Sequence, residues 1–364
     1  IDNFGYLTGY WSPGGKNKDI GWTGKPLLSL AAIPLEREVE PFFLIVGQPP
    51  DVEYFDPWIK DRRFYGVKAQ GYPEHGEDKG DFFQSFSQII EEKGLSKAKL
   101  GLELGYEGFT IEVASSTMVE RLRSLLPDAE IKNASKLLRE MRLIKTNEEI
   151  ERIKGAANIS ESVIRSSFEE VTDGMTEVEL EQIIRKHLVE HGSDTLAGYV
   201  NFGEDDILRP VDKKLKKGDF IRIDLGCTYR HYFADVARSV SFGEPSAKLK
   251  RIYDALHEVH NETMENIEPG AKCSKIFGTA KKTLKKLGVK YDPPLVAHGI
   301  GLCVHEGPYI SDNDASIQPG MTFAVEIVEK MGKGSFLTVE DTVVCEKHCC
   351  RDLTTLPKDL VIIQ

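Results

Sequence analysis

The chain has 364 residues and a formal net charge of −11, and 40% of its residues are hydrophobic while 29% are charged. This length predicts two globular domains, because a single core rarely serves so many residues. The negative charge argues against a nucleic-acid-binding protein, since phosphate contacts need clustered Lys and Arg.

The sequence also lacks the marks of membrane and secreted proteins. No apolar stretch approaches the roughly 20 residues of a membrane span, and no segment resembles a signal peptide. The sequence starts at Ile1 rather than at Met, which leaves open whether residues precede it. The irregular spacing of the cysteines favours reduced thiols in the cytoplasm over a disulfide framework. They are Cys227, Cys273, Cys303, Cys345, Cys349 and Cys350. The last three, with His348, could form part of a zinc site, but no second Cys or His pair accompanies them.

Residues 1–137 alternate strand-like and helix-like segments, which predicts a smaller α/β domain. The expected strands cover residues 26–33, 41–47 and 100–104, and the expected helices cover 81–94 and 115–127. Gly and Pro crowd residues 11–26, where we expect a long functional loop.

A second domain is expected over residues 138–364. Apolar residues at helical spacing over 141–171 predict a long amphipathic helix at its start. Asn147 is the expected N-cap, because acidic residues follow it in the first turn.

Within this second domain the sequence contains a faint internal repeat. Glycines at matching places pair as Gly174 with Gly270, Gly192 with Gly288, and Gly218 with Gly320. Asp224 and Glu326 each follow the last of these glycines by six residues. A duplicated unit of two helices and a hairpin would bring the acids of both halves to a pseudo-two-fold axis, the alternative being chance similarity of two helical pairs.

Five side chains that bind metals well interrupt apolar runs of this domain. They are Asp224, Asp235, His298, Glu326 and Glu340. Each run otherwise reads as a buried strand, where a lone carboxylate is costly to desolvate. Two divalent cations would cancel the four negative charges. A ligand set of oxygens with one nitrogen suits Mn, Co, Fe or Zn, and we favour Mn or Zn.

Such a pair of cations suits amide hydrolysis. Two metals can bridge one water, lower its pKa toward neutrality and polarise a carbonyl. The leaving nitrogen also needs a proton, for which Glu326 is the candidate donor. His305 could donate to the developing oxyanion. The alternative for His305 is a hydrogen bond to the backbone of its Gly-rich loop.

The order of the motifs DLG, YFADVAR, HGIGLCVHEGP, VE and VEDT resembles that of the pita-bread metallopeptidases. This group includes aminopeptidase P, prolidase, methionine aminopeptidase and the creatinases. NFGYLTGY at residues 3–10 resembles the N-terminal domain of the creatinase, prolidase and aminopeptidase P branch, and LIKTNEEIERIKGAA at 143–157 resembles the start of its catalytic domain. The resemblance implies an α+β chain, with a duplicated pita-bread fold in residues 138–364 and a creatinase-like α/β domain in 1–137.

The resemblance also implies roles for the five side chains. Asp224 would chelate one metal, Asp235 and Glu340 would bridge both, and His298 and Glu326 would complete the second. It further implies a homodimer, in which the N-terminal domain helps to close the partner's active site.

The chain departs from the family at four positions around this set. Ile207 and Pro294 stand where the peptidases of this branch usually carry histidines, and Thr338 stands where they often carry an arginine. Ile327 replaces a proline after the first Glu. These departures place ordinary Xaa-Pro cleavage in question while the metal ligands remain.

Three functions follow as hypotheses. The first is a two-metal hydrolase of Xaa-Pro or other short peptides. The second is a non-peptidase of the same fold that acts on a small amide or another metabolite, as in creatine or ectoine hydrolysis or a lyase reaction. The third is a catalytically silent binding module, which five retained ligands argue against.

Overall fold

The computed structural model describes residue 7 and residues 30–35, 38–46, 57–65, 81–105, 115–195 and 198–364. The chain divides into two compact units, Ile1–Glu107 with Ile111–Leu138, and Gly108–Thr110 with Arg139–Gln364. Apart from Leu7, the NFGYLTGY motif and the loop expected at 11–26 lie outside the described residues. Among the described helices, none combines the length and the apolar character needed to cross a membrane.

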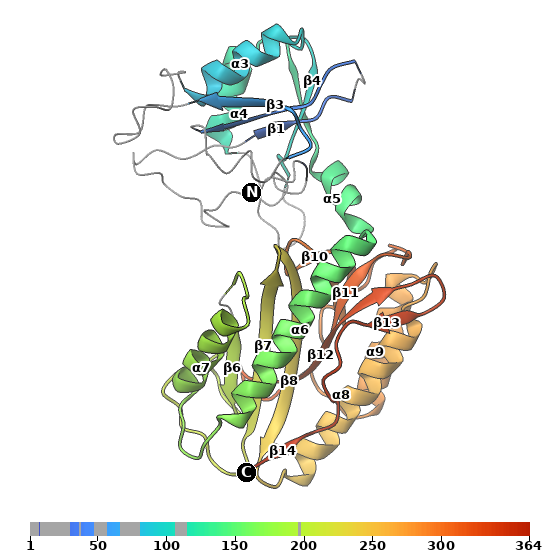
Figure 1. The fold of residues 1–364 in the computed structure, drawn as a ribbon. Coiled ribbons are helices and arrows are strands. Elements are labelled where there is room, and N and C mark those ends of the chain that lie inside the picture. Colours follow the sequence, from blue (N-terminus) through green and yellow to red (C-terminus); the bar gives the residue numbers. More distant parts are fainter. Residues whose placement is uncertain are drawn as a thin grey trace, which may run out of the picture. The chain divides into compact units, whose positions relative to one another are not determined.

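Among its described residues, the first unit contains two small sheets and the helices α3 (Phe82–Glu92) and α4 (Ser116–Leu125) (Figure 1). The strands are β1 (Leu30–Ala32), β2 (Phe42–Val46) and β3 (Asp61–Tyr65) in one sheet, and the parallel pair β4 (Lys99–Leu102) and β5 (Glu130–Asn133) in the other. The apolar face of α3 packs Phe82 and Phe86 against Phe42 of β2. The helices and strands expected between residues 41 and 127 are thereby confirmed.

Two helices begin the second unit. Helix α5 (Ser135–Leu143) crosses the boundary between the units, and α6 (Asn147–Glu169) follows it. The prediction of Asn147 as the N-cap is wrong, because Thr146 caps α6. The Thr146 side chain accepts from the backbone N–H of Glu149, whose own carboxylate accepts from the Thr146 N–H. This reciprocal capping box satisfies two N–H groups of the first turn, and Asn147 is the first helical residue.

The second unit is built on one large sheet, with nine strands among the described residues. Its main path runs β10-β9-β11-β12-β8-β7-β6, and β13 and β14 pair with β12 and β8. The strands are β6 (Tyr199–Phe202), β7 (Phe220–Tyr229), β8 (Tyr232–Phe242), β9 (Ala297–Gly299), β10 (Glu306–Ile310), β11 (Thr322–Lys330), β12 (Phe336–Cys345), β13 (Cys350–Asp352) and β14 (Ile362–Ile363). The remaining helices are α7 (Glu177–Glu190), α8 (Ala247–Asn266) and α9 (Cys273–Lys286).

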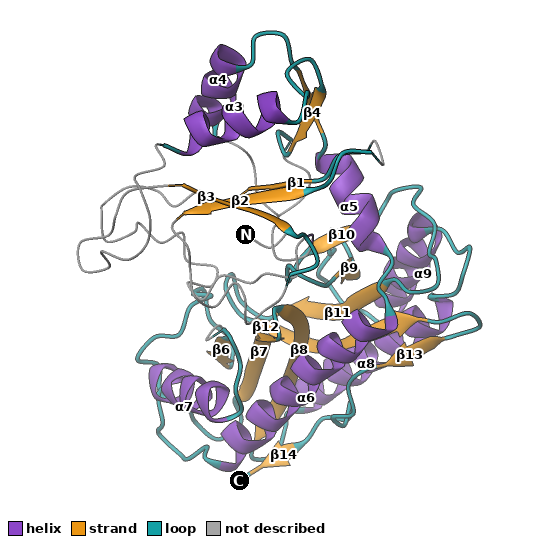
Figure 2. Cartoon of the chain, turned by 45° about the horizontal axis from the view of Figure 1, so that its top comes forward, coloured by secondary structure: helices purple, strands orange, loops and turns teal. Residues whose placement is uncertain are grey.

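Each half of the sheet is covered by its own pair of helices. Helix α6 packs on the β7–β8 hairpin, and α8 packs on β11 and β12 (Figure 2). Two apolar clusters result, one around α6, α7, β7 and β8 and the other around α8, α9, β11 and β12. Because the helices bury one face of the hairpins, alternate side chains of each strand point to the other face.

The backbone confirms the predicted duplication. The N–H of Gly174 donates to Leu215 O at 3.2 Å, and the N–H of Gly270 donates to Ile317 O at 2.9 Å. Both glycines have positive φ, +78° and +89°, which favours glycine at the bend. The matched glycines therefore mark one backbone plan used twice.

Candidate metal centre

The four predicted acids lie on the central strands of the large sheet. Glu326 on β11 is paired directly with Glu340 on β12. Asp224 on β7 and Glu340 on β12 both pair with Ala237 of β8, which lies between them. Since the methyl group of Ala237 is small, the two flanking carboxylates share a face with room between them. Asp235 reaches the same place from β8, two residues earlier.

The structure brings all six predicted site residues together. Their ligand atoms form three groups, each within 4.8 Å. The groups are Asp224, Asp235 and Glu340; His298, Glu326 and Glu340; and Asp235, His298 and His305. Within the described residues these are the groups that could hold a metal, and none contains the cysteines of the β12–β13 hairpin. The alternative of a zinc site around Cys345–Cys350 therefore lacks the required geometry, and the six cysteines are free thiols.

His298 is arranged as a neutral ligand. Its Nδ1 lies 3.1 Å from the carbonyl oxygen of Gly299, so Nδ1 carries the proton and Nε2 keeps its lone pair. Burial lowers the pKa of His298 to about 3. Nε2 lies 3.8 Å from Asp235 Oδ2 and 3.8 Å from Glu340 Oε1. That separation is too long for a hydrogen bond, but it suits atoms that share a cation at about 2.0–2.2 Å.

The carboxylates repel one another in the absence of a cation. Burial, followed by the charges of neighbouring carboxylates, raises the pKa of Asp235 and of Glu340 well above the ordinary range. Burial and Asp224 raise the pKa of Glu326 to about 7. Within the described part of the chain, His298 Nε2 and Glu340 Oε2 are buried without a hydrogen-bond partner. Buried acceptors without donors and crowded negative charges are what divalent cations satisfy, so the donor set fits them.

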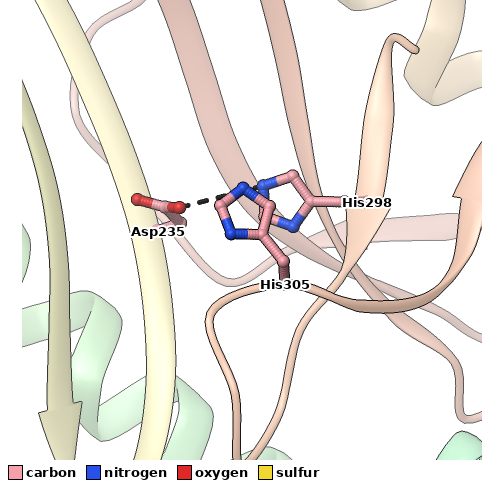
Figure 3. A group of neighbouring side chains, drawn as sticks. All are labelled: Asp235, His298 and His305. Atoms are coloured by element: carbon pink, nitrogen blue, oxygen red, sulfur yellow. Dashed lines mark ion pairs between the residues drawn. The ribbon is translucent and has the colours of Figure 1, made fainter. Parts of the chain in front are cut away.

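His305 lies against the imidazole of His298. The ring centroids are 4.1 Å apart, and Figure 3 shows both rings facing Asp235. Burial lowers the pKa of His305, although Asp224 opposes the shift. His305 thus lies at the edge of the cluster, beside the imidazole of His298.

The loop that carries His305 is held by a buried ion-pair network. The carboxylate of Glu306 pairs with Arg142, lies 3.5 Å from Lys145 Nζ and accepts from the N–H of Cys303 at 2.9 Å. Arg142 lies in the last turn of α5, and Lys145 lies in the segment between α5 and α6. The backbone of residues 303–306 is therefore fixed to the start of the unit.

The five candidate ligands differ in their access to solvent. The side chain of Glu326 is 26% exposed and that of Asp224 is 17% exposed. The side chains of Asp235, Glu340 and His298 are 9%, 2% and 1% exposed. Glu326 is therefore the most accessible of the five to solvent.

Of the four departures from the family pattern, two are buried residues and two are exposed ones. Thr338 and Ile327 are interior residues of β12 and β11. Ile207 is 49% exposed and Pro294 is also exposed. The side chain of Asn201 donates to the carbonyl oxygen of Ile207 at 3.3 Å, which holds that loop near β6.

Arg222, which is not among the predicted site residues, also contacts the carboxylates. It forms an ion pair with Asp224, and its Nη2 lies 3.9 Å from Glu326 Oε1. A charged residue inside the apolar run FIRIDLG was the available signal, because a buried arginine needs a partner of opposite charge.

Comparisons with known proteins agree with this geometry. A model of metallopeptidase family M24 matches residues 151–347. The Xaa-Pro dipeptidase of Pyrococcus furiosus is 29% identical over 286 residues, which cover 77% of this chain and 80% of that protein. The X-Pro aminopeptidase structure from Thermotoga maritima is 26% identical with a TM-score of 0.76 and covers 88% of both chains. A dipeptidase structure from Pyrococcus horikoshii, 24% identical, has a TM-score of 0.80 and covers 100% of this chain and 94% of its own.

Proposed function

The chain belongs to metallopeptidase family M24 and is a metal-dependent hydrolase, and on that premise we propose that it cleaves Xaa-Pro dipeptides or other short peptides with two divalent cations. The observation that carries the proposal is the convergence of four carboxylates and two imidazoles within three overlapping groups. A relative that is 29% identical is an Xaa-Pro dipeptidase, which supports this substrate class. Residues 138–364 would be the catalytic domain.

We assign the ligands as the resemblance implies. Asp224 would hold one cation, Asp235 and Glu340 would serve both, and His298 with Glu326 would hold the other; Mn or Zn suits the set. When bound, two such cations supply an acidified water and a polarised carbonyl. The side chains of this chain do the remaining work of orientation and proton transfer.

Glu326 and His305 act on the substrate. Glu326, the most exposed of the five, holds a proton at its carboxyl oxygen and passes it to the leaving nitrogen. His305 donates an imidazole N–H to the substrate oxygen on which charge develops. The ion pairs of Glu306 keep the His305 loop in place for this role.

A second candidate substrate is a small amide or another metabolite. Ile207 and Pro294, which replace histidines usual in the peptidases of this branch, favour it, since an aliphatic side chain offers no donor to a peptide. Six free thiols fit a reducing cytoplasm. The homodimer stays a prediction, which light scattering of the purified protein tests.

The test combines metal analysis with hydrolysis of Xaa-Pro dipeptides in added Mn²⁺ or Zn²⁺. We expect about two metal equivalents per chain, and we expect Asp235→Ala to lower turnover by roughly a thousandfold or more, since metals contribute several kcal/mol to such reactions. Asp254→Ala, on the exposed face of α8, is the control and should keep full activity. Wild-type protein that retains no metal and hydrolyses no peptide contradicts the proposal. Turnover of a small amide alone favours the second candidate.

A further inference from the structure

Arg222 is buried beside the candidate ligands. It lies two residues before Asp224 on β7, so both side chains point to the same face of the sheet. Arg222 is only 4% exposed. An arginine removed from water to this degree is stable only where opposite charge and hydrogen-bond acceptors meet it.

The guanidinium of Arg222 joins three strands. Its Nε donates to Thr338 Oγ1 on β12 at 2.9 Å. Its Nη2 pairs with Asp224 on β7 and lies 3.9 Å from Glu326 Oε1 on β11. The ring of Phe336 lies 5.8 Å from Cζ. These contacts fix the side chain in one orientation, with its charge directed at two of the carboxylates.

Arg222 also has no counterpart among the other cations. In the described part of the chain, it is the only Lys or Arg that forms an ion pair with any of the four carboxylates. Without metal, it is therefore the main source of positive charge for the cluster.

We propose that Arg222 is a built-in counter-charge and positioning residue of the metal centre, anchored by Thr338 and holding Asp224 and Glu326 in place. The proposal rests on the proposed metal centre. Thr338 stands where peptidases of this branch often carry an arginine, and here the arginine that contacts position 338 comes instead from β7. The positive charge is thus supplied from the other half of the sheet.

Thermal unfolding with and without metal tests the proposal. The variant Arg222→Met keeps the length of the side chain and removes its charge. We expect its unfolding midpoint to fall by on the order of 10 °C in chelator-treated protein, because the buried carboxylates lose their counter-charge. With Mn²⁺ bound, the cations replace that charge, so the fall should be less than half as large. An equal fall in both states, or no fall, overturns the proposal, because packing alone does not depend on metal.

A double variant tests whether a guanidinium supplied from the facing strand can replace that of Arg222. Arg222→Met combined with Thr338→Arg returns one guanidinium from the facing strand, and we expect it to recover at least half of the loss in the metal-free protein. Failure to recover contradicts the counter-charge role. Arg222→Gln, which also removes the charge but keeps a polar side chain, makes the same comparison if Arg222→Met does not fold. Thr338→Val is the matched control for the anchor and should show a smaller fall that also depends on metal.

These measurements separate the inference from the proposed function. If Mn²⁺ leaves the unfolding midpoint of the wild-type protein unchanged, the proposed metal centre is wrong. The chelator-treated variants still decide whether Arg222 supports the carboxylates, because that comparison needs neither substrate nor turnover.

Discussion

The two halves of the catalytic unit share a backbone plan but carry different chemistry at the same register position. In the first half, Asn201 of β6 pairs with Arg222 of β7, two residues before the ligand Asp224. In the second half, His298 of β9 pairs with Ala324 of β11, two residues before Glu326. The duplication therefore supplies two equivalent places next to an acid. One holds a guanidinium, and the other holds an imidazole and leaves room beside it.

The difference shows how a repeated fold yields one asymmetric site. Ala324 is small, so the imidazole of His298 can extend toward Asp235 and Glu340. Asn201 makes no such extension. Its Nδ2 donates to the carbonyl oxygens of Ile207 and Leu208, and it serves the loop instead. The repeated backbone places the acids at equivalent positions. The neighbouring side chains determine where the imidazole nitrogen and the guanidinium charge lie.

Charged contacts also tie the halves together on both faces of the sheet. On the ligand face, Arg222 of the first half bonds to Thr338 of the second. On the helix face, Arg238 of the first half pairs with Asp341 of the second at 2.6 Å and donates to the carbonyl oxygen of Glu340 at 2.5 Å. The strand that carries Glu340 is thus held from both sides by arginines of the other half.

The largest expected effect comes from replacing His298, which in the second half takes the place that Asn201 takes in the first. His298→Asn gives the second half the residue that the first half carries at Asn201. The short amide cannot reach the position of Nε2, so we expect metal affinity to fall by at least about a hundredfold. Calorimetric titration with Mn²⁺ measures the change. Asn201→Ala is the matched control in the first half and should retain its metal. Equal losses in both variants would contradict the asymmetry.

The loops that follow β6 and β9 extend the same contrast. The loop after β6 is held by the second half, because the N–H of Asp205 donates to Ser335 Oγ at 2.8 Å. The loop after β9 carries His305 and is held through Glu306 by Arg142 and Lys145, which precede the first half. Hydrogen bonds and exposed ion pairs, such as that of Asp206 with Lys333, hold the loop after β6, whereas a buried ion-pair network holds the loop after β9.

Removing the charge of Glu306 should have a large effect on a different quantity, the free energy of unfolding. Glu306→Gln removes the buried carboxylate shared by Lys145 and Arg142, which costs about 3–5 kcal/mol of unfolding free energy. Denaturant unfolding at neutral pH measures this loss. Glu148→Gln is the control, because Glu148 forms an exposed pair with Arg152 and should hardly matter.

The same variant has a defined pH dependence. Burial alone would raise the pKa of Glu306, but Lys145 and Arg142 outweigh it and lower that pKa below the ordinary 4.5. A lowered carboxyl pKa gives stability that is present above about pH 4.5 and is lost as the pH falls through the folded value. The difference between wild type and Glu306→Gln should therefore be constant near neutrality and shrink in acid. A difference that grows in acid would exclude the ion pairs as its source.

How much of this site the sequence predicts depends on how far apart along the chain the interacting residues lie. Asp224 and Glu340 are recognisable because each breaks an apolar strand, and the repeated glycines locate the duplication. The charge of Arg222 inside an apolar run signals a buried residue that needs a partner, but the sequence does not identify Thr338, which lies 116 residues away. Likewise, the pairing of Asn201 with Arg222 depends on strand register, which local patterns do not specify.

Helix capping shows the same limit over a short range. Thr146 and Asn147 are both good N-caps by residue type, and sequence favoured Asn147. The carboxylate of Glu149 decides the outcome, because it accepts the N–H of Thr146 and completes the capping box. Glu149, three positions after Thr146, thus determines which of the two residues caps the helix.

The smallest expected effect concerns the second helix of each half. Thr176 caps α7 in a capping box with Glu179, whereas in the described structure Lys272 at the start of α9 makes no side-chain capping hydrogen bond. Thr176→Ala should therefore lower the free energy of unfolding by about 1 kcal/mol. Lys272→Thr supplies the missing cap and should raise it by up to about 1 kcal/mol. Denaturant unfolding of the two variants measures both changes in stability. A loss of stability in both would contradict the difference between the two helix starts. Opposite signs would show that the duplicated halves differ in local stability as well as in the chemistry beside their acids.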